Sequence, residues 1–410
     1  MYRGENSDSI ALDDLIPDIL ARLPAKSIAR FRCVSKLWAS LLCKPYFTDL
    51  FLTRSSARPR LLIGVKQEVQ WFLFSSPQPQ NPSSLVVAAD FHMEMSFDIE
   101  YYKICGYASG LLYFPSIRIS EGYNYDMFHK DEKHAICNPS TGQYAILPEP
   151  RKTNRAGGGF LGFDPIGKQF KVLVNGRYIL TLGTENLRWR RIKCPFIAYH
   201  HFNGNGICIN GILYYVISNK GDKDNLLSCF DVRSEKVQFI SPDTRCCFSG
   251  LTKLINYKGK LGLINMEYDH SHRVGFPLKL HMCVLEDIEK REFSAYVYIL
   301  STEDKVFKVH DYISVVGATA SGEIVLVKDN ANAPFYVFYF NLERNILRSV
   351  EIQGVRLEGE EWSSGRHQVH AFVDHVEDLK FDVTKKRYAA TFVSAAQEKK
   401  LAHHLKKIIK

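Results

Sequence analysis

The sequence lacks any segment of the kind that exports a protein or anchors it in a membrane. Residues 1–9 are polar and contain no apolar run resembling a secretory signal, and no later run approaches membrane-spanning length. Both Asn-x-Ser/Thr matches, at Asn81 and Asn138, are blocked by proline in the middle position. We therefore expect a chain without a membrane span that resides in the cytoplasm and/or the nucleus.

The cysteines lack the spacing of a metal or redox site. No CxxC pair occurs, and the adjacent Cys246 and Cys247 would point to opposite faces of a strand. In a reducing compartment, cysteines with no such pattern are mostly buried thiols. The sequence therefore predicts reduced cysteines.

Motifs for catalysis are also missing, since neither GxSxG nor HExxH occurs. Residues Gly162–Lys168 have the GxxxxGK spacing of a phosphate-binding loop, but Gln169 replaces the hydroxyl residue that would hold magnesium. A strand-like run follows where that mechanism requires a helix. A β-turn explains the motif better. Gly157–Gly159 lacks the GxGxxG spacing and is interpreted as a loop.

Three histidine pairs have no second ligand pair nearby at metal-site spacing: His200 and His201, His270 and His272, His403 and His404. We expect no metal, no cofactor and no catalytic residue, and hence a protein that is not itself an enzyme.

The net charge of +9 is concentrated at one end of the chain. Residues 383–410 are rich in lysine and contain Glu398 as their single acid, so the rest of the chain is close to neutral. A basic tail accounts for the high pI, and nucleic-acid binding is not predicted. Residues 394–410 could form a basic amphipathic helix. A frayed, solvated end and a role in nuclear import or membrane-surface binding both stay open.

Apolar residues near the N-terminus recur at helical spacing: Leu12, Leu15, Ile16, Ile19, Leu20 and Leu23. A helix should begin near Asp13 or Asp14, with Pro17 in its first turn, and stop before Pro24. A second short helix should carry Ile28 and Phe31. Ser35 should cap a third, which bears Leu37, Trp38, Leu41 and Leu42 and ends before Pro45. Three short helices bury little surface, so they should pack on the chain's own C-terminal domain or bind a partner.

The run from Asp14 to Trp38, DLIPDILARLPAKSIARFRCVSKLW, closely resembles the F-box, the motif that docks onto the Skp-type adaptor of cullin ligases. The LPxKS turn and the RFxxVSKxW run carry the match. Leu12 stands where the family usually has proline, which could weaken adaptor binding. The resemblance implies these adaptor-facing residues: Leu15, Ile16, Ile19, Leu20, Leu23, Pro24, Ile28, Val34 and Trp38.

From residue 58 onward the pattern changes to short apolar runs separated by turn residues, which indicates strands and hairpins. Two themes alternate, a strand pair around a glycine and a strand–polar turn–strand unit, as in a β-propeller. Five complete four-stranded units are predicted at 91–148, 160–192, 203–240, 251–298 and 312–352. The remaining strands, at 60–65, 69–75 and 367–381, should share a sixth blade that closes the ring.

Residues 58–380 also resemble the kelch-like, F-box-associated domain of a large plant protein family. The matching phrases are CNPSTG at 137–142, FDPIGKQFKV at 163–172, YKGKL at 257–261 and FVDHVED at 372–378. The expected fold is a small all-α F-box module followed by an all-β domain, a six-bladed β-propeller. We assign residues 9–53 to the module, 58–382 to the propeller and 383–410 to the basic tail.

The resemblance implies a substrate-recognition subunit of a Skp-cullin-F-box E3 ubiquitin ligase, which binds the adaptor through the F-box and a protein substrate through the propeller. The substrate is not identified. Loop segments Tyr123–Phe128, Arg151–Arg155 and Tyr199–Phe202 are candidates for contacting it. An adaptor-independent propeller scaffold and a lectin-like binding protein are the alternatives.

Overall fold

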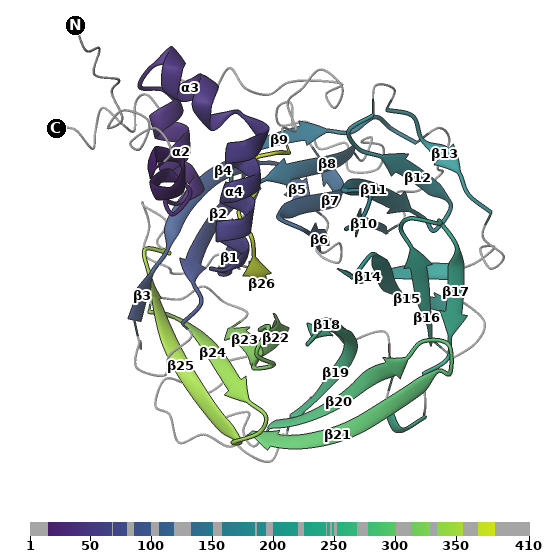
Figure 1. Ribbon diagram of the computed structural model, residues 1–410. Helices are drawn as coiled ribbons and strands as arrows, with labels where there is room; N and C mark the ends of the chain where they lie inside the picture. The colour runs from purple at the N-terminus through teal and green to yellow at the C-terminus, as the bar shows by residue number, and fades with distance from the viewer. Residues whose placement is uncertain are drawn as a thin grey trace, which may run out of the picture.

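The computed structural model describes residues 15–381 with these gaps: 68, 80–85, 100–105, 119–132, 151–157, 185–186, 194–199, 220–224, 243, 247, 250–251, 269–277, 301–312, 329–333 and 356–367. Within the described part, no helix is both long and apolar enough to cross a membrane. The fold class is the predicted one: a helical module followed by an all-β propeller (Figure 1).

The helical module contains one more helix than the sequence predicted. Residues 15–20 are helical and are followed by α2 (Ala25–Arg32), α3 (Lys36–Leu42) and α4 (Pro45–Ser56). The first helix ends earlier than expected, because residues 21–22 form a turn, and its predicted start lies outside the described residues. Ser35 caps α3 as predicted, since its Oγ accepts a hydrogen bond from the Trp38 backbone N–H at 3.2 Å. Pro45 does not merely end α3: it is the first residue of α4, where proline costs no backbone hydrogen bond.

The propeller consists of six sheets, or blades, around a central axis, and neighbouring strands are antiparallel except for one pair in blade 5 (Figure 1). Blade 1 contains β5 (Asp98–Ile99), β6 (Gly106–Ala108), β7 (Leu111–Arg118), β8 (Lys133–Asn138) and β9 (Gln143–Ile146). Blade 2 contains β10 (Gly159–Asp164), β11 (Gln169–Val174), β12 (Tyr178–Thr181) and β13 (Arg190–Arg191). Blade 3 contains β14 (His200–Ile209), β15 (Ile212–Asn219), β16 (Asn225–Asp231) and β17 (Val237–Ile240).

Blades 4 to 6 complete the ring. Blade 4 contains β18 (Lys253–Tyr257), β19 (Lys260–Tyr268), β20 (Leu278–Asp287) and β21 (Glu292–Leu300). Blade 5 contains β22 (Ile313–Ala318), β23 (Ile324–Lys328), β24 (Phe335–Asn341), β25 (Ile346–Gln353) and β3 (Val86–Ala88). Blade 6 contains β26 (Gln368–His375), β1 (Arg60–Gln67), β2 (Gln70–Pro77) and β4 (Asp90–Ser96).

The glycine-centred theme of the sequence marks the tight hairpin between the first two strands of a blade. Asn210 and Gly211 adopt φ values of 50° and 85°, and Lys258 and Gly259 adopt 51° and 84°. Two consecutive positive φ values match the right-handed twist of the flanking strands, and the second is adopted most readily by glycine. The Gly162–Lys168 motif is likewise a β-turn, between β10 and β11.

The ring closes through the predicted sixth blade, in which strands from both ends of the domain pair. β26 pairs antiparallel with β1, with Val369 opposite Val65 and Phe372 opposite Leu62. The predicted boundaries need two corrections: β4 pairs with β2 and so belongs to blade 6 instead of opening the first unit, and β26 ends at His375.

A strand exchange between blades was not predicted. β3 leaves blade 6 and pairs in parallel with β25, the outer strand of blade 5, with Val86 opposite Glu351 and Ala88 opposite Gln353. The added strand covers an edge that would otherwise present unpaired backbone groups.

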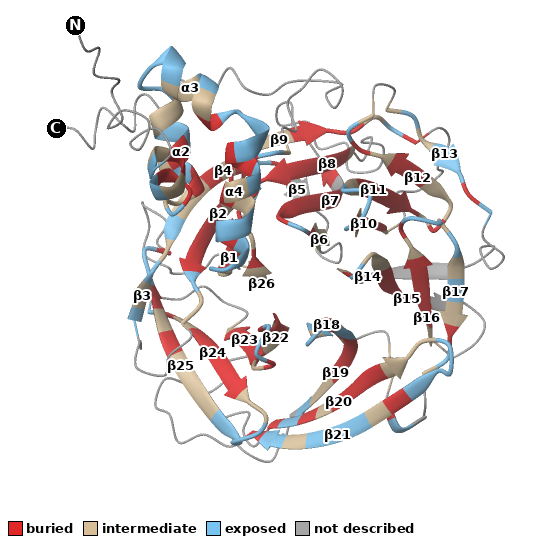
Figure 2. Cartoon of the chain, viewed as in Figure 1, coloured by how far each residue is buried: buried red, intermediate tan, exposed pale blue. Residues whose placement is uncertain are grey.

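The propeller core is divided among the boundaries between neighbouring blades. At the boundary of blades 6 and 1, for example, Leu62 and Trp71 pack with Leu112 and Phe114. Figure 2 shows the buried residues along the strands of each blade. Because each boundary buries side chains from two blades, every blade depends on both of its neighbours.

The expectation that the cysteines are reduced is wrong for one pair. Cys246, in a short 3₁₀ helix (Thr244–Cys246), forms a disulfide with Cys283 of β20, and their Cα atoms lie 5.4 Å apart. The partners are far apart in sequence and meet only when the blade forms, so their spacing gave no sign of the bond. Cys137 and Cys229 are buried and form no disulfide, as expected.

Candidate functional site: an apolar face on a docked helical module

The helical module has a small core that includes one residue from the far end of the chain. Its buried members are Leu20, Ala21, Ala25, Ile28, Leu42, Phe47, Phe51 and Leu379. Leu379 follows the last propeller strand, so this core is complete only when the C-terminal segment lies against the helices. A module too small to stabilise itself is thereby joined to a large domain.

The predicted adaptor-facing residues fall into three groups by exposure. Leu15, Ile19 and Val34 are exposed, with 56%, 59% and 67% of their surface accessible. Ile16, Leu23, Pro24 and Trp38 are half-buried. Leu20 and Ile28 are buried in the module core. Those two therefore hold the helices together in this structure, and the assignment of the nine residues to an adaptor interface stays a prediction. Leu12 lies outside the described residues.

Two exposed apolar residues were not among the predicted site residues. Leu37, at the start of α3, has 77% of its surface accessible, and Tyr46, in the first turn of α4, has 65%. Leu37 follows Val34 by three positions, and Trp38 packs its ring against that of Phe31 with centroids 5.6 Å apart. The apolar spacing of α3 does not show which of Leu37 and Trp38 is exposed, because the position of the neighbouring helices decides which of the two is covered. We define the apolar face as Leu15, Ile19, Val34 and Leu37.

One residue of the apolar face, Leu37, lies in α3. In Figure 1, α3 is the helix farthest from the propeller, and Figure 2 shows it largely exposed. Large apolar side chains exposed on a small helical module are candidates for a binding surface.

A buried carboxylate joins α2 to the C-terminal strap, which we define as residues 376–381. Glu377, 5% exposed, accepts a hydrogen bond at Oε1 from the backbone N–H of Ala25, the first residue of α2, at 3.2 Å. It replaces the side-chain cap that Pro24 cannot provide. The Glu377 backbone N–H in turn donates to Ser55 Oγ of α4 at 2.8 Å. Burial raises the pKa of the Glu377 carboxyl, although the Arg60 charge and the Ala25 hydrogen bond oppose this.

The same strap is bonded to blade 1 through the CNPSTG phrase of the sequence. Asn138 is buried, and its Nδ2 donates to the carbonyl oxygens of Asp378 at 3.0 Å and Phe381 at 2.9 Å. The Asp378 backbone N–H donates to Ser140 Oγ at 3.1 Å. The phrases CNPSTG and FVDHVED thus lie together at the point where the ring closes. One short segment holds the helical module and the propeller in a fixed relation.

The module sits on one face of the propeller. The chain enters β1 at Arg60 and leaves β26 at His375, so both ends adjoining the module lie at the same end of blade 6. Because strands in a blade alternate in direction, the segments 119–132, 269–277 and 329–333 begin and end at the opposite face.

The three predicted substrate-contacting segments connect strands at that opposite face. Tyr123–Phe128 and Arg151–Arg155 lie outside the described residues. Tyr199 does too, while His200 and the residues after it begin β14. The structure therefore does not describe the side chains of these segments.

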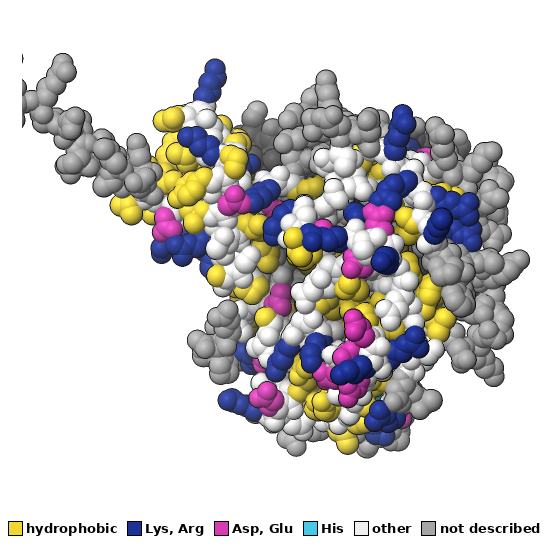
Figure 3. Space-filling model, turned by 45° about the vertical axis from the view of Figure 1, so that its right-hand side comes forward, with side chains coloured by type: hydrophobic (Ala, Val, Ile, Leu, Met, Phe, Trp, Pro, Cys, Tyr) yellow, Lys and Arg dark blue, Asp and Glu magenta, His cyan; other side chains and the backbone are white. Residues whose placement is uncertain are grey.

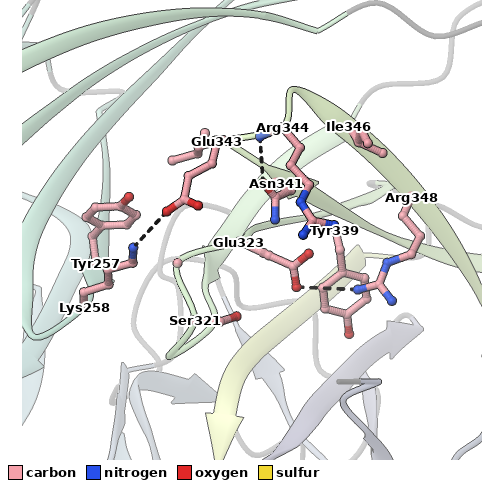
Figure 4. Close-up of a pocket in the computed structure, with 12 residues that line it drawn as sticks. Tyr257, Lys258, Ser321, Glu323, Tyr339, Asn341, Glu343, Arg344, Ile346 and Arg348 are labelled. Carbon is pink, nitrogen blue, oxygen red and sulfur yellow. Dashed lines mark hydrogen bonds and ion pairs between the residues drawn. The ribbon is translucent and has the colours of Figure 1, made fainter. Parts of the chain in front are cut away.

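A hollow of about 410 Å³ lies between the hairpin turns of blades 4 and 5 (Figure 4). Four of its charged side chains form two ion pairs: Lys258 Nζ lies 3.7 Å from Glu343 Oε1, and Arg348 Nη2 lies 3.5 Å from Glu323 Oε2. The Arg348 guanidinium also lies 5.2 Å from the Tyr339 ring centroid. The lining has three basic side chains, Lys258, Arg344 and Arg348, and two acidic ones, Glu323 and Glu343, so its net charge is only +1.

The described residues contain no group of three or more His, Cys, Asp and Glu side chains placed to hold a metal ion. Cys208, which is half-buried in β14, is not set up as a nucleophile: burial raises the pKa of its thiol to about 11, although hydrogen bonds with the backbone of Phe163 and Gly211 oppose this.

Family models match both the helical module and the propeller. A family model described as "F-box domain" matches residues 13–50, and one described as "F-box associated beta propeller domain" matches residues 60–376. F-box protein At1g67130 of Arabidopsis thaliana is 51% identical over 94% of this chain and 82% of its own length. F-box protein At1g31080 of the same species is 50% identical over 95% and 87%. A solved protein from Lactobacillus plantarum matches 72% of this chain and 82% of its own at 8% identity, with a TM-score of 0.39.

Proposed function

Since the chain belongs to the F-box proteins that carry an F-box associated beta propeller domain, we propose that it is a substrate-recognition subunit of a Skp-cullin-F-box ubiquitin ligase. The observation that carries this proposal is the apolar face, Leu15, Ile19, Val34 and Leu37, exposed on a module whose own core is already complete. Such a face is suited to binding a partner, and the F-box match supports a Skp-type adaptor as that partner, which would connect the chain to a cullin-RING ligase.

The proposed mechanism is bridging. The module binds the adaptor, the propeller binds a protein substrate, and the strap holds the two at a fixed separation through Glu377 and Asn138. A substrate held near the ubiquitin-loaded enzyme reacts as though at high local concentration. The chain itself performs no covalent step in this scheme and needs no cofactor. We propose the cytoplasm and/or the nucleus as its location.

Adaptor capture by the full chain tests the proposal. Val34→Ser combined with Leu37→Ser removes two exposed anchors from the apolar face without touching the module core, so adaptor affinity should fall at least about tenfold. The matched control is Ile166→Ser with Ile346→Ser, two propeller residues with 74% and 56% of their surface exposed. Equal capture by the two variants, or no capture by the wild-type chain, would contradict the proposed role.

A further inference from the structure

A second hollow, of about 560 Å³, opens between blades 2 and 3. It is lined by the end of blade 2, including Arg190, Arg191 and Lys193, and by the turn before β17, including Glu235 and Lys236. We call it the basic hollow. No sequence motif singled it out, although residues 188–193, RWRRIK, contain four cations and no acid.

Glu235 is the single acidic residue lining the basic hollow, and its carboxylate already forms ion pairs. Its Oε1 accepts from the buried Lys171 Nζ at 2.7 Å and also pairs with Arg190. Burial opposes ionisation, but the hydrogen bonds from Arg190 and Lys171 prevail and lower the pKa of Glu235. The Glu235 backbone has a φ of 60°, which is uncommon for a residue other than glycine. The ion pairs with Lys171 and Arg190 help to hold the residue in this conformation. Glu235 therefore leaves no unpaired negative charge in the basic hollow.

The remaining cations are available. Arg191, Lys193 and Lys236 are exposed, and in the described part of the chain none of them forms an ion pair. Figure 3, which brings this side of the ring forward, shows Lys and Arg side chains gathered over it. The hollow between blades 4 and 5 has one more basic side chain than acidic ones, whereas the basic hollow has three more. The formal charge summed over the propeller sequence is close to zero, so it does not reveal this local excess of positive charge.

We propose that the basic hollow binds an acidic segment of the protein substrate, one with clustered Asp and Glu side chains. This inference rests on the proposed function, and it narrows the protein substrate to one that has an acidic segment. Arginine forks bind carboxylates through paired hydrogen bonds, and neighbouring lysines add charge without demanding geometry. Arg190, already oriented by Glu235, keeps half of its side-chain surface exposed.

A protein ligand fits the basic hollow better than a nucleic acid does. Single-stranded nucleic acids are bound by basic tracks interleaved with exposed aromatic rings. The apolar lining here is aliphatic, Ile192 and Val237. The neighbouring Trp189 is half-buried, and its Nε1 donates to the Pro148 carbonyl oxygen at 2.6 Å.

Fluorescence anisotropy of a labelled peptide of alternating Glu and Ser, titrated with the full chain, tests the proposal. The wild-type chain should bind it, more weakly as salt is raised, and should bind the matching Gln and Ser peptide at least about tenfold more weakly. Arg191→Glu with Lys236→Glu should reduce affinity for the Glu peptide at least about tenfold. Arg291→Glu with Arg344→Glu changes the net charge equally at exposed turns of blades 4 and 5, and should reduce it by less than about threefold.

Three results would overturn the proposal: no binding of the Glu peptide, equal losses in the two double variants, or tighter binding of a single-stranded RNA through the same two residues. Adaptor capture by Arg191→Glu with Lys236→Glu should match wild type, because the apolar face is unchanged. Failed adaptor capture by the wild-type chain would thus count against the proposed function alone, and failed peptide binding against the basic hollow alone.

Discussion

At the scale of single residues, periodicity showed which side chains are apolar but not what covers them. Leu20 belongs to the same apolar helical series as Leu15 and Ile19, yet Leu20 is buried and the other two are exposed. The difference comes from α4 and from Leu379, which the spacing within the first helix cannot reveal. Leu37 was missed as a site residue for the same reason.

Glu377 gives a prediction at this scale. Glu377→Ala leaves the buried Ala25 N–H without an acceptor and should lower the free energy of unfolding by about 1–3 kcal/mol. Glu377→Gln keeps an acceptor oxygen, and because burial raises the pKa of this carboxyl, the neutral side chain should be tolerated. Urea unfolding of the full chain at neutral pH measures both. Equal losses for Ala and Gln would show that the charge, and not the acceptor, matters.

Two histidines of β26, His370 and His375, predict how the stability of the chain depends on pH. Burial lowers the pKa of His370 to about 4 and that of His375 to about 3, against an ordinary value of 6.5. Below pH 6.5 the unfolded chain therefore binds protons that the folded chain does not take up until about pH 4. Stability is fully present above pH 6.5 and falls as the pH is lowered through this window.

His370→Phe should make this loss of stability with acid shallower, because the ring packed on Trp71 would no longer titrate. Burial raises the pKa of Glu377 and Asp378, which acts in the opposite direction at the acid end, so the variant is compared with wild type at each pH. Thermal melts between pH 7.5 and 4.5 provide the data. Parallel curves for the two proteins would refute the assignment to His370.

At the scale of elements, the sequence predicted most strands and missed two features that depend on partners. α4 has no regular apolar stripe, and its leading Pro45 was interpreted only as a stop. β3 spans three residues and gains its strand character from β25 in another blade. Local patterns identify elements that bury one face at their own period, but not elements that a distant neighbour stabilises.

The outer strand of blade 4 gives the prediction at this scale. β21 is at the edge of its sheet, and Val297 and Ile299 have 60% and 53% of their surface exposed. Long apolar edges promote association. Val297→Lys with Ile299→Lys should reduce self-association in light scattering while changing stability by less than about 0.5 kcal/mol. Leu300→Lys, at a position with 1% exposure, should instead destabilise the propeller. Unchanged light scattering would show that this edge does not drive self-association.

At the scale of the whole molecule, the repeat period and the count of leftover strands predicted six blades and their closure, because an unpaired edge at each end requires a partner. The docking of the module could not be predicted, since it depends on Glu377, Asn138 and Leu379, which are joined only by the folded ring. The domain boundaries at 53, 58 and 382 stay predictions.

Three C-terminal truncations separate closure from docking. Removal of everything after Arg366 deletes β26 and should destabilise the whole propeller, with aggregation on size exclusion. Removal after His375 keeps β26 but deletes the strap, so the propeller should persist while the helical module becomes sensitive to proteolysis. Removal after Val383 should be nearly silent. Equal melting of the first and last truncations would refute the shared closing blade.

The central claim is that this chain brings a bound protein to a ubiquitin ligase through its apolar face. Proximity labelling by the full chain, with the proteasome inhibited, measures this directly when ubiquitin on the labelled neighbours is quantified. Neighbours of the wild-type chain and of Ile166→Ser with Ile346→Ser should be ubiquitinated to the same extent. Those of Val34→Ser with Leu37→Ser should be labelled equally but carry much less ubiquitin. If ubiquitination of the labelled proteins were the same for all three chains, the account would be contradicted.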